Sequence, residues 1–266
     1  MKWEELTADQ FRQAVRDVQG VCLLPVGVIE KHGPHLPLGT DLFAAREISI
    51  RAATIESVVV FPEYYLGQIF EAKHQPGTIA IGSRLMLDLL EAVCSEIARN
   101  RLHKIVIYNG HGGNDKLLRY FIQSQLERPR DYVVYLATPR SDPEFEQRLK
   151  GIRATEFDYH AGEFETSWMM EIRPDLVKLD AAGKEPGARQ GRLDSVADTY
   201  TAIGWYSNFP HHYAGNGQPA SREKGKLTME HAVAQLVQVL REVKADQTAP
   251  ALQHEFFRRA DNPAGE

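Results

Sequence analysis

The sequence has no long apolar segment and no excess of charge of either sign. None of its hydrophobic runs reaches the roughly 20 residues that a membrane-spanning helix requires. The opening stretch, MKWEELTADQF, carries acids where a signal peptide needs a basic start and an apolar core. With 31 basic and 36 acidic residues, the net charge of -5 offers no basic surface for nucleic acid or an anionic membrane. These features predict a soluble cytoplasmic protein whose partner is a small molecule or another copy of itself.

Cysteine is also scarce, because Cys22 and Cys94 are the only two in 266 residues. Cys22 lies in an apolar run and Cys94 in a helical pattern, where buried and unreactive thiols are common. We therefore expect no structural disulfide. The length and a hydrophobic content of 43% suffice for a sizeable core. We expect one domain over residues 1–247, followed by a C-terminal tail, 248–266.

Hydrophobic patterning predicts alternating strands and helices. Short apolar runs rich in β-branched and aromatic residues predict buried strands at 20–29, 57–65, 103–110 and 131–139. Apolar residues at spacings of three and four predict helices at 42–55, 83–102, 115–127, 160–172 and 221–245. This alternation implies an α/β fold, a three-layer α/β/α sandwich with a mostly parallel central sheet. Ligands of such folds bind beyond the carboxyl ends of the strands.

The loop after the first predicted strand, GVIEKHGPHLPLGTD, spans residues 27–41. Its glycines and prolines predict an irregular backbone rather than a helix. Glu30, His32 and Asp41 lie here, and zinc, manganese and iron all accept carboxylate and imidazole ligands. Glu30 and His32 are two residues apart, so they point the same way in an extended chain. The alternative is a solvated Glu30, a hydrogen-bonding His32 and an Asp41 that caps the next helix.

The loop after the third predicted strand, YNGHGGND, spans residues 108–115. His111 lies between glycines, which leaves its ring and nearby backbone amides open to an anion or a polarised oxygen. The spacing is GxGG rather than GxGxxG, and the nearest downstream acid, Asp131, lies at the start of a strand. The loop is therefore no dinucleotide fingerprint. A tight turn between strand and helix is the alternative explanation of its glycines.

A third polar segment, DYHAGEFETSWMM, spans residues 158–170. If its helix begins near Ala161, His160 and Glu163 share one face, whereas Glu165 points elsewhere. Only one of the two glutamates then shares a site with His160. The alternative is that both acids only complement the dipole at the start of the helix.

Two further segments supply candidate substrate-binding residues. His74 and Thr78 lie near a turn in EAKHQPGT, and His212 lies in NFPHHYAGNGQ, a glycine-rich segment suited to a lid. Surface or packing roles are the alternative for such histidines.

Together, PVGVIEKHGPHLPLGTD, NGHGGN and HAGEFETS resemble, in order and separation, the creatininase family of metal-dependent amidohydrolases. The resemblance spans about residues 20–180. It implies an α/β/α fold, two divalent metal ions such as zinc and manganese, and a homo-oligomer, commonly a hexamer. By motif, it implies that Glu30 and His111 bind one metal, that His32 binds the other, and that Asp41 bridges both.

The chain departs from this pattern at Gly113. Creatininase has a glutamate at the matching position, two residues after the histidine of the second motif, as a ligand of the second metal. Relatives with the HGGN form carry HAGE, which implies that Glu163 supplies the missing carboxylate. The spacing of three residues between His160 and Glu163 favours the same residue.

The resemblance also implies a mechanism, in which a metal-bridging hydroxide hydrolyses the substrate. His160 matches the catalytic histidine of the family and is expected to pass a proton to the leaving group. Glu163 or Glu165 is expected to accept the proton of the attacking water. Glu165 is further expected to orient a metal ligand rather than bind a metal itself.

The implied substrate is a small cyclic amide or a cyclic ketone. Tyr159 and Glu156 replace an acid and the substrate-stacking tryptophan of creatininase, which disfavours creatinine itself. Residues 205–217 most resemble the branch that hydrolyses an inositol-derived cyclic diketone, as 3-dehydro-scyllo-inosose hydrolases do. Two other classes stay open. One is a non-catalytic metal- or ligand-binding accessory protein of the same fold, favoured by Gly113, and the other is a phosphate- or dinucleotide-binding protein.

Overall fold

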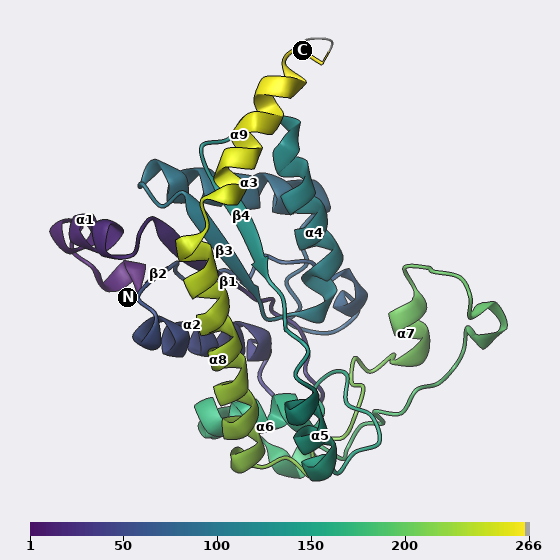
Figure 1. Cartoon of the computed structure of the whole chain (residues 1–266). Coiled ribbons are helices and arrows are strands. Elements are labelled where there is room, and N and C mark those ends of the chain that lie inside the picture. Colours follow the sequence, from purple (N-terminus) through teal and green to yellow (C-terminus); the bar gives the residue numbers. More distant parts are fainter. Residues whose placement is uncertain (264–266) are drawn as a thin grey trace.

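A parallel four-stranded sheet forms the centre of the computed structural model, which describes residues 1–263 (Figure 1). The strands lie in the order β2-β1-β3-β4. Their bounds are β1 Val21–Val26, β2 Val59–Val60, β3 Lys104–Asn109 and β4 Val133–Ala137. β1 and β3 pair over their full lengths, from Val21 with Lys104 to Val26 with Asn109. The loops that follow β1 and β3 therefore leave the same edge of the sheet side by side.

Helices cover both faces of this sheet, which confirms the three-layer α/β/α sandwich. On one face, α2 (Thr40–Ile55) and α8 (Arg222–Ala245) pack against Val21 and Leu23. On the other face, α3 (Ser83–Arg99) and α4 (Asp115–Ser124) pack against Cys22 and Leu24. Successive side chains of β1 therefore point alternately into two separate hydrophobic cores, one on each face of the sheet, as expected for a strand buried on both sides. Cys94 contributes to the second core, and both cysteines are buried free thiols in the described chain.

Several helices lie outside the segments predicted from the sequence. They are α1 Ala8–Asp17, α5 Pro143–Ile152, α7 Gly204–Asn208 and α9 Thr248–Ala260. Helix α6, Glu163–Ile172, was predicted but begins later than expected, and it packs along α8. Short 3-10 helices connect these elements: Trp3–Glu5, Phe70–Ala72, Gly112–Asn114, Gln125–Glu127, Pro174–Leu176, Leu179–Ala181 and Asp194–Val196. Within residues 1–263, no helix has the length and apolar character that spanning a bilayer demands.

The expected C-terminal tail forms helix α9 over most of its length. Gln253 donates hydrogen bonds to the carbonyls of Arg130 and Tyr132, at the start of β4, and Phe257 is buried. Helix α9 is therefore held next to the start of β4 (Figure 1). Residues 264–266 of the expected tail lie outside the described residues.

A long excursion of the chain, residues 183–210, projects from the body of the molecule and carries α7 (Figure 1). We call it the arm. Its two sides are joined at the base by a hydrogen bond from Gln190 N to Asn208 O, 3.0 Å long. Beyond the arm, Ala214 forms an isolated antiparallel bridge with His160. The chain therefore returns from the arm next to the segment that precedes α6.

Candidate metal centre

Acidic and imidazole side chains from three separated segments meet at the carboxyl edge of the sheet. Three come from the loop after β1 and the first turn of α2, one from the loop after β3, and two from the segment around the start of α6. All except Glu165, whose side chain is 23% exposed, are buried. The members of this cluster are Glu30, His32, Asp41, His111, His160 and Glu165.

Two glycines allow the first turn of α2 to reach this edge. A Cβ on Gly27 would lie 2.7 Å from the backbone of Leu42, and one on Gly110 would lie 2.8 Å from the carbonyl oxygen of Asp41. Gly110 also donates a 2.8 Å backbone hydrogen bond to Val26, which ties the two strand ends together. The start of α2 therefore packs directly on the ends of β1 and β3, and Asp41 projects between the two loops.

The first group of ligand atoms comprises Glu30, Asp41 and His111. Nδ1 of His111 lies 2.8 Å from Glu30 Oε1 and 2.9 Å from Asp41 Oδ2. Among the described residues, however, neither oxygen has a hydrogen-bond partner in acceptable geometry, although both are buried. Buried polar atoms almost always have a hydrogen-bond partner or bind an ion. Buried atoms that lie this close together without hydrogen bonds between them therefore indicate a site for a bound group. A divalent cation, bound by two carboxylate oxygens and an imidazole nitrogen, fits this group.

The second group shares Asp41 with the first. Nε2 of His32 lies 3.0 Å from Asp41 Oδ1 and 3.9 Å from Glu165 Oε2. Asp41 therefore presents Oδ2 to the first group and Oδ1 to the second, as a carboxylate that bridges two cations would.

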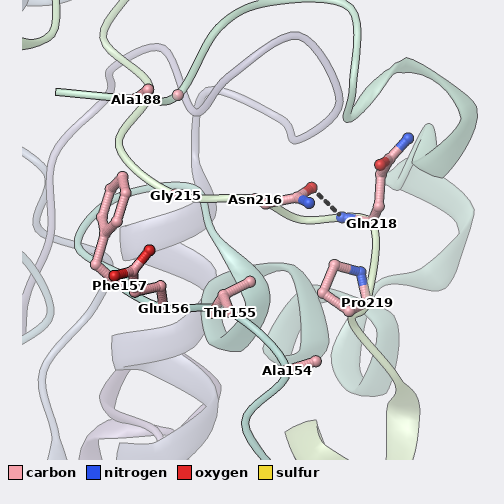
Figure 2. Close-up of a pocket in the computed structure, with 10 residues that line it drawn as sticks. Ala154, Thr155, Glu156, Phe157, Ala188, Gly215, Asn216, Gln218 and Pro219 are labelled. Carbon is pink, nitrogen blue, oxygen red and sulfur yellow. Dashed lines mark hydrogen bonds between the residues drawn. The ribbon is translucent and has the colours of Figure 1, made fainter. Parts of the chain in front are cut away.

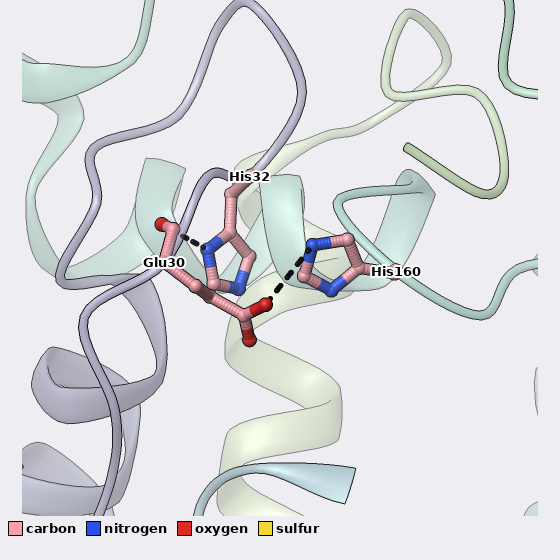
Figure 3. A group of neighbouring side chains, drawn as sticks. All are labelled: Glu30, His32 and His160. Atoms are coloured by element: carbon pink, nitrogen blue, oxygen red, sulfur yellow. Dashed lines mark hydrogen bonds and ion pairs between the residues drawn. The ribbon is translucent and has the colours of Figure 1, made fainter. Parts of the chain in front are cut away.

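His160 joins the cluster from the opposite side (Figure 3). Its Nε2 lies 3.8 Å from Glu30 Oε2, and its ring centroid lies 4.4 Å from that of His32. The same Nε2 lies 2.8 Å from the carbonyl oxygen of Lys31, which can only accept a hydrogen bond. Nε2 therefore carries the proton of a neutral ring, and Nδ1, 3.9 Å from Glu165 Oε2, keeps its lone pair.

Without a metal, the carboxylates of the cluster attract protons to two of its histidines. Burial opposes the charged form of His32, but Asp41, by its charge and its hydrogen bond, outweighs burial and raises the pKa of His32 to about 10. Burial likewise opposes the charged form of His111, whose pKa is raised well above its usual value by Glu30 and Asp41. The pKa of Glu30 is held well below its usual range, despite burial, chiefly by the charge of His111. The metal-free cluster thus holds imidazolium groups where cations fit.

Two further titratable groups of the cluster, His160 and Glu165, respond chiefly to burial. Burial lowers the pKa of His160 to about 3, against the opposing charge of Glu30. Burial raises the pKa of Glu165 to about 7, against the opposing charge of His32. At neutral pH, His160 is therefore a neutral ring in this environment.

The structure does not bring Glu163 to the cluster, in contrast to the expectation from the sequence. Its buried carboxylate forms an ion pair with Lys224 and accepts hydrogen bonds from the backbone amides of Ala154 and Thr155 and from the Thr155 hydroxyl. These partners occupy both oxygens. Burial alone would raise the pKa of Glu163, but Lys224 and the hydrogen bonds lower it.

Glu165 lies in the cluster in place of Glu163, because α6 begins two residues later than the sequence predicts. Gly162 is the N-cap, so His160 is outside the helix and the spacing of three residues no longer places it beside Glu163. Ala161, at φ +54°, turns the chain sharply between them, and Glu165 reaches back to accept a hydrogen bond from the amide of Ala161. No local sequence signal marks this positive φ, since the residue is not a glycine.

The three residues predicted to bind substrate lie outside the cluster. His212 is buried, and both of its ring nitrogens are bonded, one to Trp205 Nε1 and the other to Glu30 Oε2. His74 is exposed and lies 2.8 Å, through Nε2, from the carbonyl oxygen of Pro210. Thr78 donates its hydroxyl proton to the carbonyl of Ala72. The contact between His212 and Glu30 was not foreseen, because 182 residues separate the two in sequence.

A pocket of about 1410 Å³ lies near the cluster but is not lined by any of its six residues. It lies between the arm, the 3-10 helix at Phe70–Ala72 and the start of α4, and its lining includes His74, Gly113, Trp205 and Tyr206. Gly113 lies so close to the ring of His111 that a Cβ there would overlap the ring, and Trp205 is bonded to His212. The pocket therefore reaches residues that contact the cluster, and His74 is the predicted substrate residue in its wall.

A smaller pocket, of about 670 Å³, lies at the segment between α5 and α6 (Figure 2). Its wall includes Ala154 and Thr155, whose amides bind Glu163, together with Phe157 and Asn216. Glu156, the residue at the position of the substrate-stacking tryptophan of creatininase, also lines this pocket.

We predict that Gly113→Ala weakens metal binding by at least about tenfold, since a Cβ there would overlap Nε2 of His111 and lie 2.8 Å from Glu71 Oε1. Displacing the ring moves a candidate metal ligand. Gly112→Ala is the matched control, because its Cβ would meet no described atom within 4 Å. Metal titration of the purified variants measures the effect, and equal affinity of both variants would contradict it.

A protein-family model described as "Creatininase: Creatinine amidohydrolase" matches residues 4–240. Among curated relatives, the creatinine amidohydrolase of Pseudomonas putida is 29% identical over 256 residues, which cover 90% of this chain and 95% of the relative. A mycofactocin precursor peptide peptidase of Mycolicibacterium smegmatis is 34% identical over 59% of this chain and 60% of its own. The 3-dehydro-scyllo-inosose hydrolase of Thermotoga maritima is 23% identical over 91% of this chain and 83% of its own.

Solved structures similar to this one include two creatininases. One, described as creatininase Mn, has a TM-score of 0.77 and 25% identity, and the match covers 92% of this chain and 99% of the other. The second is a creatininase variant of Zn-Zn type, with a TM-score of 0.76, 25% identity, and coverage of 92% and 98%.

Proposed function

Since this chain belongs to the creatininase family, we propose that it is a metal-dependent hydrolase whose active centre holds two divalent ions. The observation that carries the proposal is the convergence of buried oxygens of Glu30 and Asp41 on Nδ1 of His111 without bonding geometry. Glu30, Asp41 and His111 would bind one ion. His32, Asp41 and Glu165 would bind the other.

The ligand set suits zinc, manganese or iron, because it combines imidazole with carboxylate and contains no thiolate. Manganese and zinc are supported by the descriptions of the similar creatininase structures. Two bound ions would polarise the scissile carbonyl and lower the pKa of a water molecule between them. Glu165 takes the role that we first expected of Glu163, since its carboxylate lies within reach of His32 and Asp41.

His160 is the residue that we assign to proton transfer. Its Nε2 proton is held by the carbonyl of Lys31, so Nδ1 is free to accept a proton from the attacking water. As water adds to the carbonyl carbon and the carbon–nitrogen bond breaks, the same nitrogen returns the proton to the departing nitrogen. Burial keeps the ring neutral before the reaction, so Nδ1 carries no proton of its own.

For the substrate, we propose a small cyclic amide, the class acted on by the Pseudomonas putida relative named above. A cyclic ketone derived from inositol is the alternative from the Thermotoga maritima relative. A peptide amide is a third candidate substrate. It is favoured by the pocket of about 1410 Å³, larger than the 300–1,000 Å³ typical of small-molecule sites, and by the peptidase relative.

The experiment that tests this proposal is an activity screen with zinc- and manganese-loaded protein. The panel contains lactams and other cyclic amides, keto-inositols, formamides and short peptides, and Asp41→Ala protein is the blank. We expect turnover of one class, abolished in the blank and by chelation. Metal binding without turnover of any class would favour a non-catalytic accessory protein, and nucleotide binding that survives chelation would favour a phosphate-binding protein.

We further propose that the chain forms a homo-oligomer, a hexamer by the family resemblance. Light scattering of the purified protein measures its mass, and a value near the 30.0 kDa of one chain would exclude this assembly.

Metal uptake is predicted to release protons at neutral pH. The pKa of His32 is raised to about 10 and that of His111 well above its usual value, so metal-free protein holds protons on these rings. A metal must displace the proton of His32, and the apparent affinity of the ion that His32 binds should therefore rise about tenfold per pH unit between pH 7 and 9. Calorimetry in buffers of different ionisation enthalpy counts the protons. Histidines with ordinary pKa values near 6.5 would instead give affinities that level off above about pH 7.5.

A further inference from the structure

The ring of His212 connects the wall of the large pocket to a candidate metal ligand. Its Nδ1 receives a 3.0 Å hydrogen bond from Nε1 of Trp205, and its Nε2 contacts Oε2 of Glu30. Because an indole N–H can only donate, Nδ1 of His212 must be the unprotonated nitrogen, and Nε2 carries the proton. The two hydrogen bonds therefore run in one direction, from Trp205 through His212 to Glu30.

The backbone of His212 adopts a conformation that residues other than glycine rarely adopt. Its φ is +53°, in the left-handed region, and its side chain is 1% exposed. Such a backbone is strained in a residue other than glycine and persists only where the surroundings fix it. Here the amide of His212 bonds to Phe209, and Ala214, two residues later, pairs with His160. The fold thus accepts strain in order to bury this imidazole against Glu30.

The contact with His212 also determines which oxygen of Glu30 faces the metal site. Oε2 is engaged by His212, and Oε1, without an aligned partner among residues 1–263, lies 2.8 Å from Nδ1 of His111. A rotated carboxylate would withdraw Oε1 from that group. The N–H donor therefore holds the carboxylate plane in the orientation that a metal ligand requires.

We propose that His212 and Trp205 are positioning residues, which act through two successive hydrogen bonds to orient Glu30 as a metal ligand. This inference rests on the proposed function, because that function assigns Glu30 to the metal centre. Trp205 lies on α7, in the arm, and lines the large pocket. A molecule bound in the pocket against Trp205 would therefore contact the first residue of a series of hydrogen bonds that leads through His212 to Glu30, a candidate metal ligand.

Two single variants separate this role from simple packing. His212→Asn removes the donor to Glu30 but keeps a residue type that tolerates positive φ. Trp205→Phe keeps an aromatic ring on α7 but removes the indole N–H donor together with part of the bicyclic ring. Trp168→Phe is the matched control, because Trp168 Nε1 donates a 2.7 Å hydrogen bond to Thr228, between α6 and α8.

The experiment is a titration of metal-free, full-length protein with Mn²⁺, in which the free ion is measured by electron paramagnetic resonance. We expect His212→Asn to weaken binding of one ion by about 10–100-fold, Trp205→Phe to weaken it about three- to tenfold, and Trp168→Phe to match the wild type. The double variant should match His212→Asn alone, because the two hydrogen bonds act in series. The visible spectrum of Co²⁺-loaded protein should change in the same variants.

Each other outcome overturns a defined claim. Wild-type affinity in both single variants, or effects of the two substitutions that multiply, would refute the positioning role while the metal centre stands. If the wild type binds no Mn²⁺ or Co²⁺, the proposed function fails together with this inference. If His212→Asn proves unstable by thermal unfolding without metal, Trp205→Phe decides by comparison with Trp168→Phe, which loses the same atoms at a site away from His212.

Discussion

Replacing Asp41 by asparagine is expected to release both metal ions and to abolish activity. Oδ1 of Asp41 lies 3.0 Å from His32 Nε2, and Oδ2 lies 2.9 Å from His111 Nδ1, so one carboxylate serves both groups of ligand atoms. Replacing any residue that serves one group should leave the other ion bound. We expect the affinity for each ion to fall by more than the about 10–100-fold typical of residues outside the ligand shell. Elemental analysis after dialysis measures the stoichiometry.

The same variant should be less stable even in the absence of metal. Asp41 is the buried carboxylate that contacts both His32 and His111, whose imidazolium forms it stabilises. Removing one partner of a buried ion pair costs about 3–5 kcal/mol. Urea unfolding in chelator at pH 7 measures this loss. Asp9→Asn is the control, because Asp9 also lies in the first turn of a helix but is exposed, and its substitution should change stability by less than about 0.5 kcal/mol. Retention of two ions in the Asp41 variant would contradict the shared ligand.

The second large effect distinguishes the two neighbouring glutamates of α6. Glu165→Gln should reduce the metal content from two ions to one, because its carboxylate lies beside His32 and Asp41. Glu163→Gln should keep both ions and lose about 3 kcal/mol of stability, since the substitution leaves Lys224 partly buried without its partner. Metal analysis and urea unfolding of both variants give the four values needed.

These expectations are opposite for the two residues, so the experiment has a clear contrary result. If Glu163→Gln loses an ion while Glu165→Gln keeps two, the assignment first expected from the sequence is right and the geometry at α6 is wrong. Lys224→Met, together with Glu163→Gln, provides a check on the structural role. The pair should restore part of the lost stability, because it removes both charges of the ion pair.

β1, β3, β4 and the longest helices could be predicted from the sequence because their patterns are strong, whereas only Val59–Val60 of the strand predicted at 57–65 forms a strand. β1 and β3 are continuous apolar runs buried on both faces, and α3 and α8 repeat apolar residues over four turns or more. The meeting of Glu30, His32 and His111 at one edge follows from parallel pairing alone, since consecutive loops of a parallel sheet leave from the same side. The family motifs point to the same residues, and the match over residues 4–240 confirms the family.

The remainder of the site depends on contacts that no local pattern encodes. The start of α6 was misplaced because Ala161 adopts a positive φ that its residue type does not signal, and this shift exchanged Glu163 for Glu165. The role of His212 depends on a return of the chain after the arm, 182 residues beyond its partner Glu30. Helix α9 was taken for a tail because the hydrogen bonds of Gln253 to the start of β4 are tertiary contacts, which the local sequence does not encode.

The closed base of the arm has a consequence for how enzymes of this fold can diverge. The hydrogen bond between Gln190 and Asn208 joins the two sides of the excursion before the chain reaches the buried core. Lengthening or replacing a loop whose ends are already fixed costs little conformational entropy, about 0.6 kcal/mol for each doubling of its length. Relatives could therefore vary the arm outside α7 and acquire new selectivity, while Trp205 on α7 keeps its hydrogen bond to His212 and the ends of β1 and β3 keep the metal-binding residues in place.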